Sequence, residues 1–375
     1  MAGIYFHIPF CHQACHYCDF HFTTVKGDED RVVQAMLKEL QARKGELENA
    51  SVSSIYFGGG TPSLLPASML FRLLNATRTS FQVTTDAEVT LEANPEDLTT
   101  EKLASWSDHG INRLSIGIQS FHDIDLRYMN RNHSGMEALE AVGRARKAGF
   151  ELLTIDLIYG TPTMDDDAWA SNLETMKLQG LDHFSAYALT VEPRTALHHL
   201  VGTRALAQPE EDQAARQFHQ LMKWARQNDF EQYEISNFAR NQKYSYHNTS
   251  YWRGTSYLGI GPSAHSFDGK NVRRWNVRNN HEYVRKVAED LITYEQETLS
   301  LEERFDEYVM TSLRTHSGID RSFIKNEFGS FFLDHLDAAL KKIPIATWLE
   351  DHNGKVTLTD QGKLFADTIA SRLFY

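Results

Sequence analysis

The chain has 375 residues, 41% of them hydrophobic, which is enough for a large core and is typical of one large domain with a smaller one. Its formal net charge of −12 argues against a protein that wraps nucleic acid, so we expect no nucleic-acid partner. No apolar run approaches the roughly 18 residues that span a membrane, and the N-terminus lacks a basic, signal-like segment, so we expect a cytoplasmic protein.

Apolar runs typical of β-strands alternate with helical patterns through the first two thirds of the chain. The expected strands are Gly3–Ile8, Ser54–Phe57, Glu88–Ala93, Arg113–Ile118, Leu152–Ile158 and His183–Leu189. The expected helices are Asp28–Leu47, Pro66–Arg78, Thr99–Ser107, Gly135–Ala148, Asp165–Gln179 and Pro209–Asn228. Alternating βα units indicate parallel strands with crossover helices in an α/β fold, either a partial (β/α)6 barrel or a doubly wound sheet.

The C-terminal pattern is mainly helical, with expected helices at Leu301–Thr315 and Arg321–Lys342. The segment Trp348–Thr359 contains the turn-like run Asp351-His352-Asn353-Gly354 and precedes a final helix. Helices followed by a small β wing are typical of a winged-helix domain, which we expect to pack against the barrel because it is not notably basic. The expected division of the chain is a barrel over residues 1–235, a connecting segment over 236–298 and a smaller domain over 299–375.

All three cysteines of the chain lie in the loop after the first strand, as Cys11, Cys15 and Cys18 with C-x₃-C-x₂-C spacing. A disulfide framework would spread an even number along the chain, so this cluster predicts a metal site in a reducing compartment. Four thiolates complete a [4Fe–4S] cluster, and three leave one iron open for a small ligand. The alternative is a zinc ion, with a fourth ligand from the histidines nearby, His12, His16 or His21. The end of a first strand is the active-site face of a β/α barrel, which favours the cluster.

The cysteine spacing, with Tyr17 just before the last cysteine, resembles the signature of radical S-adenosylmethionine (SAM) proteins. The run YFHIPF over residues 5–10 narrows the resemblance to the branch of oxygen-independent coproporphyrinogen III oxidases and HemW haem chaperones. It implies that the three cysteines hold a [4Fe–4S] cluster whose open iron binds the amino and carboxylate groups of SAM. One electron from an external donor would then cleave SAM to methionine and a 5′-deoxyadenosyl radical.

The later strands each end in a glycine or polar feature, where the resemblance places the rest of SAM. A glycine run lets the backbone approach a ligand closely. Carboxylate, amide and guanidinium groups can bond the ammonium, ribose and carboxylate groups. Each residue alone is more often structural, and their roles are implied by the resemblance. The implied SAM-binding residues are Tyr5, Tyr17, Gly59, Gly60, Thr61, Glu92, Gln119, Arg131, Asp156 and Ala188.

Two departures from the oxidases match the chaperone group. Phe20 stands where many oxidases carry another cysteine, and only ten residues precede Cys11, where the oxidases have a long N-terminal extension. The run HNTSYW over residues 247–252 also matches the H-N-x-x-Y-W motif of the chaperones, in which the histidine is the proposed haem ligand. An isolated histidine would more often fix a loop, so a haem-binding role for His247 rests on the resemblance.

Three functions remain open from the sequence. The leading hypothesis is a haem chaperone, with [4Fe–4S], SAM and haem as cofactors, that delivers haem to acceptor haemoproteins such as membrane-bound respiratory proteins. The second is an enzyme, an oxidase that decarboxylates two propionates of coproporphyrinogen III. The third is a structural zinc-binding protein.

Overall fold

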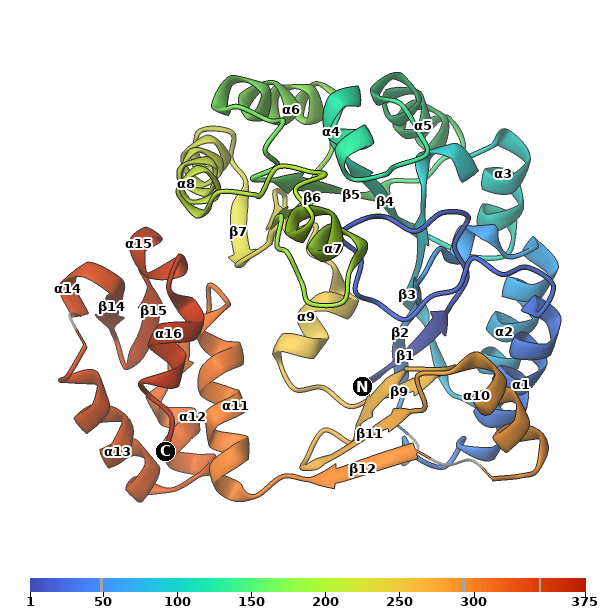
Figure 1. Ribbon diagram of the computed structural model, residues 1–375. Coiled ribbons are helices and arrows are strands. Elements are labelled where there is room, and N and C mark those ends of the chain that lie inside the picture. The colour runs from blue at the N-terminus through green and yellow to red at the C-terminus, as the bar shows by residue number, and fades with distance from the viewer. Residues whose placement is uncertain (48–49, 292–293, 344) are drawn as a thin grey trace.

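Six parallel strands form the centre of one large sheet in the computed structural model, which describes residues 1–47, 50–291, 294–343 and 345–375 (Figure 1). In sequence and in neighbouring positions across the sheet they are β1 (Ala2–Ile8), β2 (Val52–Gly59), β3 (Val83–Ala93), β4 (Arg113–Gln119), β5 (Leu152–Tyr159) and β6 (His183–Ala188). This order lacks the reversal that defines a doubly wound sheet, so the predicted (β/α)6 arrangement is confirmed. Within the described ranges the outermost strands of the sheet do not pair with each other, so the barrel is partial and open.

Helices follow these strands in the chain, and most of them lie outside the sheet (Figure 1). They are α1 (Glu29–Ala42), α2 (Ala67–Ser80), α3 (Thr100–Asp108), α4 (Asp123–Tyr128), α5 (Gly135–Lys147), α6 (Asp166–Leu178), α7 (Ala196–Gly202) and α8 (Glu211–Gln227). Local sequence explains their starts. Ser134 and Glu137 form a capping box at the start of α5, and Asp165 caps α6 by accepting a hydrogen bond from the N–H of Ala168 at 2.8 Å.

The first helix is shorter than the predicted Asp28–Leu47. The guanidinium of Arg43 is buried and donates hydrogen bonds to the carboxylates of Glu39 and Glu46 at 2.7 and 2.9 Å. These ion pairs hold the chain in a turn just after α1. The carboxylates also offset the desolvation cost of burying the guanidinium charge. Without them, the buried charge would strongly destabilise the fold.

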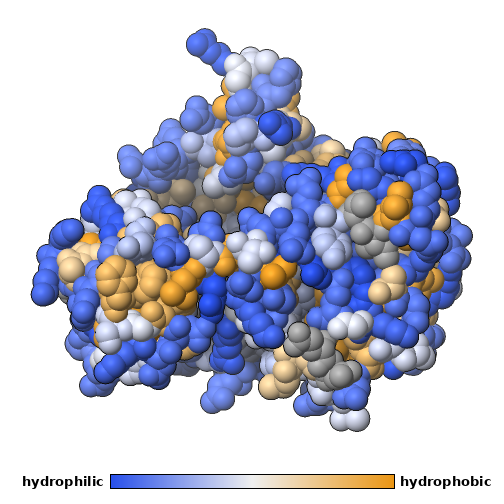
Figure 2. All heavy atoms as spheres, turned by 90° about the horizontal axis from the view of Figure 1, so that it is seen from below, coloured by the Kyte–Doolittle hydropathy of each residue, from blue (hydrophilic) through white to orange (hydrophobic). Residues whose placement is uncertain are grey.

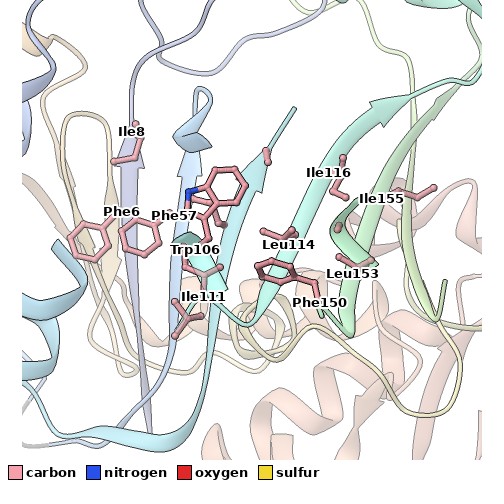
Figure 3. Packing of buried hydrophobic residues seen from close by; sticks show 14 of the residues in the cluster. Phe6, Ile8, Phe57, Trp106, Ile111, Leu114, Ile116, Phe150, Leu153 and Ile155 are labelled. Carbon is pink, nitrogen blue, oxygen red and sulfur yellow. The ribbon is translucent and has the colours of Figure 1, made fainter. Parts of the chain in front are cut away.

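The space between the strands and the outer helices is filled by apolar side chains (Figure 3). Phe6 of β1 and Phe57 of β2 stack with ring centroids 5.0 Å apart. Trp106 of α3 and Ile116 of β4 are buried beside the neighbouring strands. Burying side chains of this size contributes roughly 1.5–3 kcal/mol each. The core thereby holds fixed the strand ends that carry the polar residues of the site.

Short strands that the sequence pattern did not predict extend both edges of the sheet. On the β1 side they are β9 (Tyr257–Ile260), which is parallel to β1, then β10 (His265–Phe267), β11 (Val272–Asn276) and β12 (Tyr294–Thr298). On the β6 side they are β8 (Asn237–Ala239) and β7 (Glu231–Glu234). The segment also forms α9 (Tyr246–Trp252) and α10 (Asn280–Ala288). Residues 236–298 therefore contribute five short strands, within the described ranges, to the same sheet as the barrel.

The C-terminal part has its own apolar core and a three-stranded sheet. Its elements are α11 (Leu301–Leu313), β13 (Ile319–Asp320), α12 (Arg321–Glu327), α13 (Ser330–Leu340), α14 (Ile345–Trp348), β14 (Leu349–His352), β15 (Lys355–Leu358), α15 (Asp360–Lys363) and α16 (Ala366–Ser371). The predicted β wing is the β14–β15 hairpin, whose turn residues Asn353 and Gly354 have φ of 54° and 80°, as a tight hairpin turn requires.

The prediction of one continuous helix over Arg321–Lys342 is wrong. The chain breaks between α12 and α13 at Gly329, whose φ of 92° does not fit a helix. The expected final helix is likewise two short helices.

The surface seen in Figure 2 is mainly hydrophilic, with apolar side chains gathered in smaller patches. Several of the exposed large apolar residues belong to the C-terminal part, among them Phe323, Phe331, Phe365 and Tyr375. No helix within the described ranges is long and apolar enough to cross a bilayer.

Candidate functional site

The three cysteines line a pocket of about 450 Å³ at the C-terminal ends of the parallel strands. The hydroxyl of Thr61 donates to Cys11 Sγ at 3.5 Å, and Arg131 Nη1 donates to Cys15 Sγ at 3.3 Å. Burial raises the pKa of Cys11 to about 11 and that of Cys18 to about 12. Without a metal the two thiols are therefore protonated at neutral pH, and iron would have to displace their protons on binding.

The cysteine loop is tied to the segment that follows α4. Asn130, in a left-handed conformation with φ of 59°, donates through Nδ2 to the carbonyl of Ala14 at 2.7 Å. Gln13 donates back to the carbonyl of Asn130 at 3.0 Å, and the N–H of His16 donates to the carbonyl of Met129 at 3.1 Å. These bonds fix the loop on both sides of Cys15.

The glycine run at the end of β2 packs against the backbone of the cysteine loop. Gly60 N–H donates to the carbonyl of Ile8 at 2.8 Å, and Thr61 N–H donates to the carbonyl of Phe10 at 2.7 Å. A Cβ on Gly60 would lie 2.8 and 2.9 Å from those two carbonyl oxygens, too close for any side chain. Gly59 has a φ of 112°, which only glycine adopts readily. The glycines therefore let two strand ends approach each other, in addition to leaving room for a ligand.

Two partly buried carboxyl groups line the same pocket. Glu92 accepts hydrogen bonds from the hydroxyl of Tyr56 at 2.8 Å and from the N–H of Gly59 at 3.2 Å. Asp156 accepts one from the hydroxyl of Ser115 at 3.4 Å. Burial, and then the charge of Asp156, raises the pKa of Glu92 to about 7, and burial raises the pKa of Asp156 to about 6. A cationic ligand would offset the repulsion between the two carboxylates, because it would favour the ionised form of each.

Arg131 lines the same pocket. Its Nη2 donates to Asn94 Oδ1 at 2.6 Å and to the carbonyl of Gly117 at 2.7 Å, whereas its buried Nε has no partner. A buried donor without a partner costs about 1–3 kcal/mol, which a bound anion would remove. Gln119, at the end of β4, has a φ of 69°, a strained conformation of the kind found at binding sites. Partly buried carboxyl groups and a guanidinium that line one pocket fit the charged amino-acid end of SAM.

The structure brings together nearly all the residues that the sequence assigned to the cluster and SAM. The pocket is lined by Cys11, Cys15, Tyr17, Cys18, Gly59, Gly60, Thr61, Glu92, Gln119, Arg131, Asp156 and Ala188. Tyr5 does not line it and instead hydrogen-bonds through its hydroxyl with His7 Nδ1 at 3.1 Å. Among the residues described, no three His, Cys, Asp or Glu side chains are arranged to hold one metal ion.

Sequence reasoning missed Tyr56 and Asn94. Tyr56 holds Glu92, and Asn94 links Thr61 to Arg131 by accepting from the arginine and donating to Thr61 Oγ1 at 3.4 Å. The position of Asn94 could have predicted a role in the site, because it follows β3 directly, where parallel strands present ligand-binding groups. The position of Tyr56 could not, because an aromatic residue within a strand is usually part of the core.

His247 lies away from this pocket, on α9, and is 2% exposed. Its Nδ1 is hydrogen-bonded to Ser54 Oγ at 2.8 Å and its Nε2 to the hydroxyl of Tyr251 at 3.0 Å. Burial lowers the pKa of His247 to about 3, so the ring is neutral. Glu88 orients the helix by accepting hydrogen bonds from the N–H groups of Tyr246 and His247 at 3.0 and 2.9 Å.

The C-terminal end of the H-N-x-x-Y-W motif, which begins at His247, lies at a second cavity. Tyr251 and Trp252 line a cleft of about 790 Å³ between the sheet and the C-terminal part, which we call the interdomain cleft. Among the residues that the structure describes, none lines both this cleft and the cysteine pocket.

Comparison with known proteins identifies the family of this chain. Residues 5–176 match the model of the radical SAM superfamily. Over 372 residues, covering 98% of both chains, the sequence is 31% identical to the heme chaperone HemW of Bacillus subtilis. The chain belongs to the HemW family.

Three further similarities agree with this family. Residues 299–365 match the HemN C-terminal domain, and the heme chaperone HemW of Escherichia coli is 35% identical over 74% of both chains. The solved structure of E. coli coproporphyrinogen III oxidase (HemN), a radical SAM enzyme, superposes with a TM-score of 0.85. It covers 100% of this chain and 90% of its own at 24% identity, which establishes the fold. Membership of the radical SAM superfamily implies SAM and a [4Fe–4S] cluster.

Proposed function

We propose that this HemW family member is a cytoplasmic haem chaperone, which holds a [4Fe–4S] cluster and SAM, binds haem and passes it to acceptor haemoproteins, including membrane-bound respiratory proteins. The observation that carries the proposal is the pairing of two separate cavities in one fold. One is the cysteine pocket, and the other is the interdomain cleft, to which the H-N-x-x-Y-W motif contributes Tyr251 and Trp252. The names of the HemW relatives support haem as the cargo.

In this proposal, different pocket residues bind different groups of SAM. Arg131 binds the carboxylate of the methionine part through its unpaired Nε, and Glu92 binds the ammonium. Gln119 and Asp156 bond the ribose, and Ala188 contacts adenine. When bound there, the cluster and SAM would supply one-electron chemistry, with the electron coming from an external donor.

The assignment of His247 as a haem ligand stays a prediction. Both of its ring nitrogens are already hydrogen-bonded, to Ser54 and Tyr251. Ligation through either nitrogen would therefore require the ring to exchange one of these bonds for iron. An alternative role is to hold Tyr251 at the edge of the interdomain cleft.

The test is an anaerobic haemin titration of the cluster-reconstituted protein, followed by mixing with an excess of an apo-haemoprotein. We expect saturable binding at one haem per chain and transfer of haem to the acceptor. Protein that binds no haem but converts coproporphyrinogen III to its decarboxylated product would establish the oxidase function instead. Protein that retains zinc and cannot be reconstituted with iron would support the structural zinc alternative.

A further inference from the structure

The interdomain cleft has the size and lining of a site for a flat aromatic ligand. Its volume of about 790 Å³ lies within the roughly 300–1,000 Å³ typical of cofactor sites. Nine of its 26 lining residues are Tyr, Trp or Phe, about three times the share of these residues in the whole chain. They come from both walls, for example Tyr257 from the sheet and Tyr308 from α11. Aromatic faces on two walls suit a planar ring between them.

The cleft is cationic within an acidic protein. Five Lys and Arg residues line it against three Asp and Glu residues, whereas the whole chain carries a net charge of −12. Two of the acidic residues are already paired, Glu307 with Arg273 and Glu327 with Arg304. The third, Asp320, caps α12 by accepting hydrogen bonds from two backbone N–H groups.

Two of the cations lining the cleft have no acidic partner. Arg253, just after the H-N-x-x-Y-W motif, and Lys355, on β15, form no salt bridge with any residue in the described part of the chain. Cations left unpaired at the edge of a binding cleft favour anionic ligands. Two such residues match a ligand that carries two carboxylate groups.

A histidine in the same cleft is arranged as metal-ligating histidines are. His316 Nδ1 is hydrogen-bonded to the carboxylate of Glu231 at 2.6 Å, and that carboxylate also accepts a hydrogen bond from the hydroxyl of Tyr244. His316 Nε2 has no hydrogen bond within the described ranges, and the side chain is 38% exposed. An ionised carboxylate on Nδ1 fixes that nitrogen as the N–H and leaves Nε2 with its lone pair.

The backbone around His316 is also fixed. Its N–H donates to the carbonyl of Tyr233 at 3.0 Å, and the ring meets Tyr244 edge-on with centroids 6.0 Å apart. Its position therefore depends on β7 as well as on the end of α11. This contrasts with His247, both of whose ring nitrogens are occupied.

We propose that haem binds in the interdomain cleft, with its iron on Nε2 of His316 and its two propionates on Arg253 and Lys355. The inference rests on the proposed function, from which the identity of the cargo comes. It assigns the H-N-x-x-Y-W motif the role of building one wall of the cleft through Tyr251 and Trp252.

The test is an anaerobic haemin titration of the full chain, followed by absorbance and magnetic circular dichroism, with His316→Ala and His247→Ala variants. We use His219→Ala as the matched control, because His219 is exposed on α8 and lines neither cavity. We expect the His316→Ala variant to lose the spectrum of histidine-ligated haem, and added imidazole to restore it. The control should keep the wild-type spectrum, and circular dichroism should show both variants folded.

The outcomes separate the two proposals. If the wild-type protein binds no haem saturably, the proposed function fails. If it binds haem and His316→Ala keeps the wild-type spectrum, the assignment of His316 is overturned while the chaperone proposal stands. If only His247→Ala loses the histidine signature, without loss of folding, the ligand is His247.

A second experiment tests the propionate contacts. The Arg253→Ala/Lys355→Ala double variant should bind haemin roughly tenfold more weakly than the wild type, the size expected from two exposed charge pairs. It should bind haem dimethyl ester, which lacks both charges, as well as the wild type does. Equal weakening for haemin and the ester would overturn the charge pairing.

Discussion

The ring of Tyr56 stacks on the ring of His247 with their centroids 4.8 Å apart, while its hydroxyl donates a hydrogen bond to Glu92. One side chain therefore touches both the SAM pocket and the H-N-x-x-Y-W motif. His247 continues the contact to Tyr251, which lines the interdomain cleft. Four buried or partly buried side chains thus form a continuous connection between the two cavities.

The Tyr56→Phe substitution should weaken SAM binding while preserving the stack on His247. It removes a hydrogen bond that favours ionised Glu92, so the carboxyl becomes more neutral at pH 7 and a poorer partner for the SAM ammonium. We expect about a tenfold loss of affinity, corresponding to ~1.4 kcal/mol, by calorimetric titration of the cluster-loaded protein. Tyr5→Phe is the control, because the hydroxyl of Tyr5 bonds with His7 instead. Equal affinity in Tyr56→Phe and wild type would show that Glu92 does not bind the ammonium.

SAM affinity should rise with pH between about 5 and 8. Glu92, with a pKa of about 7, must lose its proton to pair with the ammonium of SAM. Asp156, with a pKa of about 6, ionises more readily when a cation lies nearby, so binding at lower pH requires proton release. Calorimetry in buffers of different ionisation enthalpy measures the protons released. In the Glu92→Gln variant the step near pH 7 should disappear. Affinity independent of pH would contradict the assignment of these carboxyl groups to SAM.

The ligand-free protein should show the opposite pH dependence in its stability. The pKa of Glu92 is raised in the folded state, so its contribution is fully present below about pH 4.5 and is lost as the pH rises through about 7. Burying an ionised Glu92 would then cost up to about 3 kcal/mol. Thermal unfolding of wild type and Glu92→Gln between pH 5 and 8 measures this. We expect the wild-type Tm to fall more steeply with pH than that of the variant.

Gly60→Ala should destabilise the protein and disturb the cysteine loop. Its Cβ would meet the carbonyl oxygens of Ile8 and Phe10, which are backbone atoms that cannot turn aside. We expect a loss of about 1–3 kcal/mol in the free energy of unfolding, together with poorer iron uptake. Gly143→Ala on α5 is the matched control, because no atom lies within 4 Å of its added Cβ and alanine favours a helix. Two variants of equal stability would show that the strand ends can separate without cost.

Cys15→Ser should abolish cluster assembly and leave the barrel folded. A serine oxygen is a poor substitute for an iron-bound thiolate, and Cys15 lies in a loop that is held by several bonds to residues 129–131. Iron and sulfide content after anaerobic reconstitution, with circular dichroism for folding, are the measurements. His12→Ala is the control, because His12 is exposed in the same loop and is a fourth ligand only in the zinc alternative. Normal iron content in Cys15→Ser would show that the ligands are assigned wrongly.

The features that could be predicted from the sequence are those that depend on residue type and on the order of residues along the strands. The six parallel strands could be predicted because their apolar runs are continuous and are followed by helical patterns. The hairpin turn at Asn353-Gly354 could be predicted because both residues tolerate positive φ. The family motif then led to the cysteines and to residues at the strand ends, most of which line one pocket in the structure.

Features that depend on contacts distant in sequence could not be predicted. The edge strands β9 to β12 are three to five residues long and partly polar, so the partner strand rather than their own pattern fixes them. The pairing of His316 with Glu231 joins residues 85 positions apart. Tyr5 was assigned to SAM by its place in a motif, but its hydroxyl bonds with His7 and it does not line the pocket.

The complete separation of the two cavity linings has a consequence for how ligands are loaded. Since no described residue lines both cavities, the two proposals place SAM and haem in separate parts of the same chain. They predict that one chain binds both ligands together and in either order. Saturating concentrations of one should leave room for a full equivalent of the other. Any influence between the two ligands would then pass through the protein, and the stacked rings of Tyr56 and His247 provide one described route.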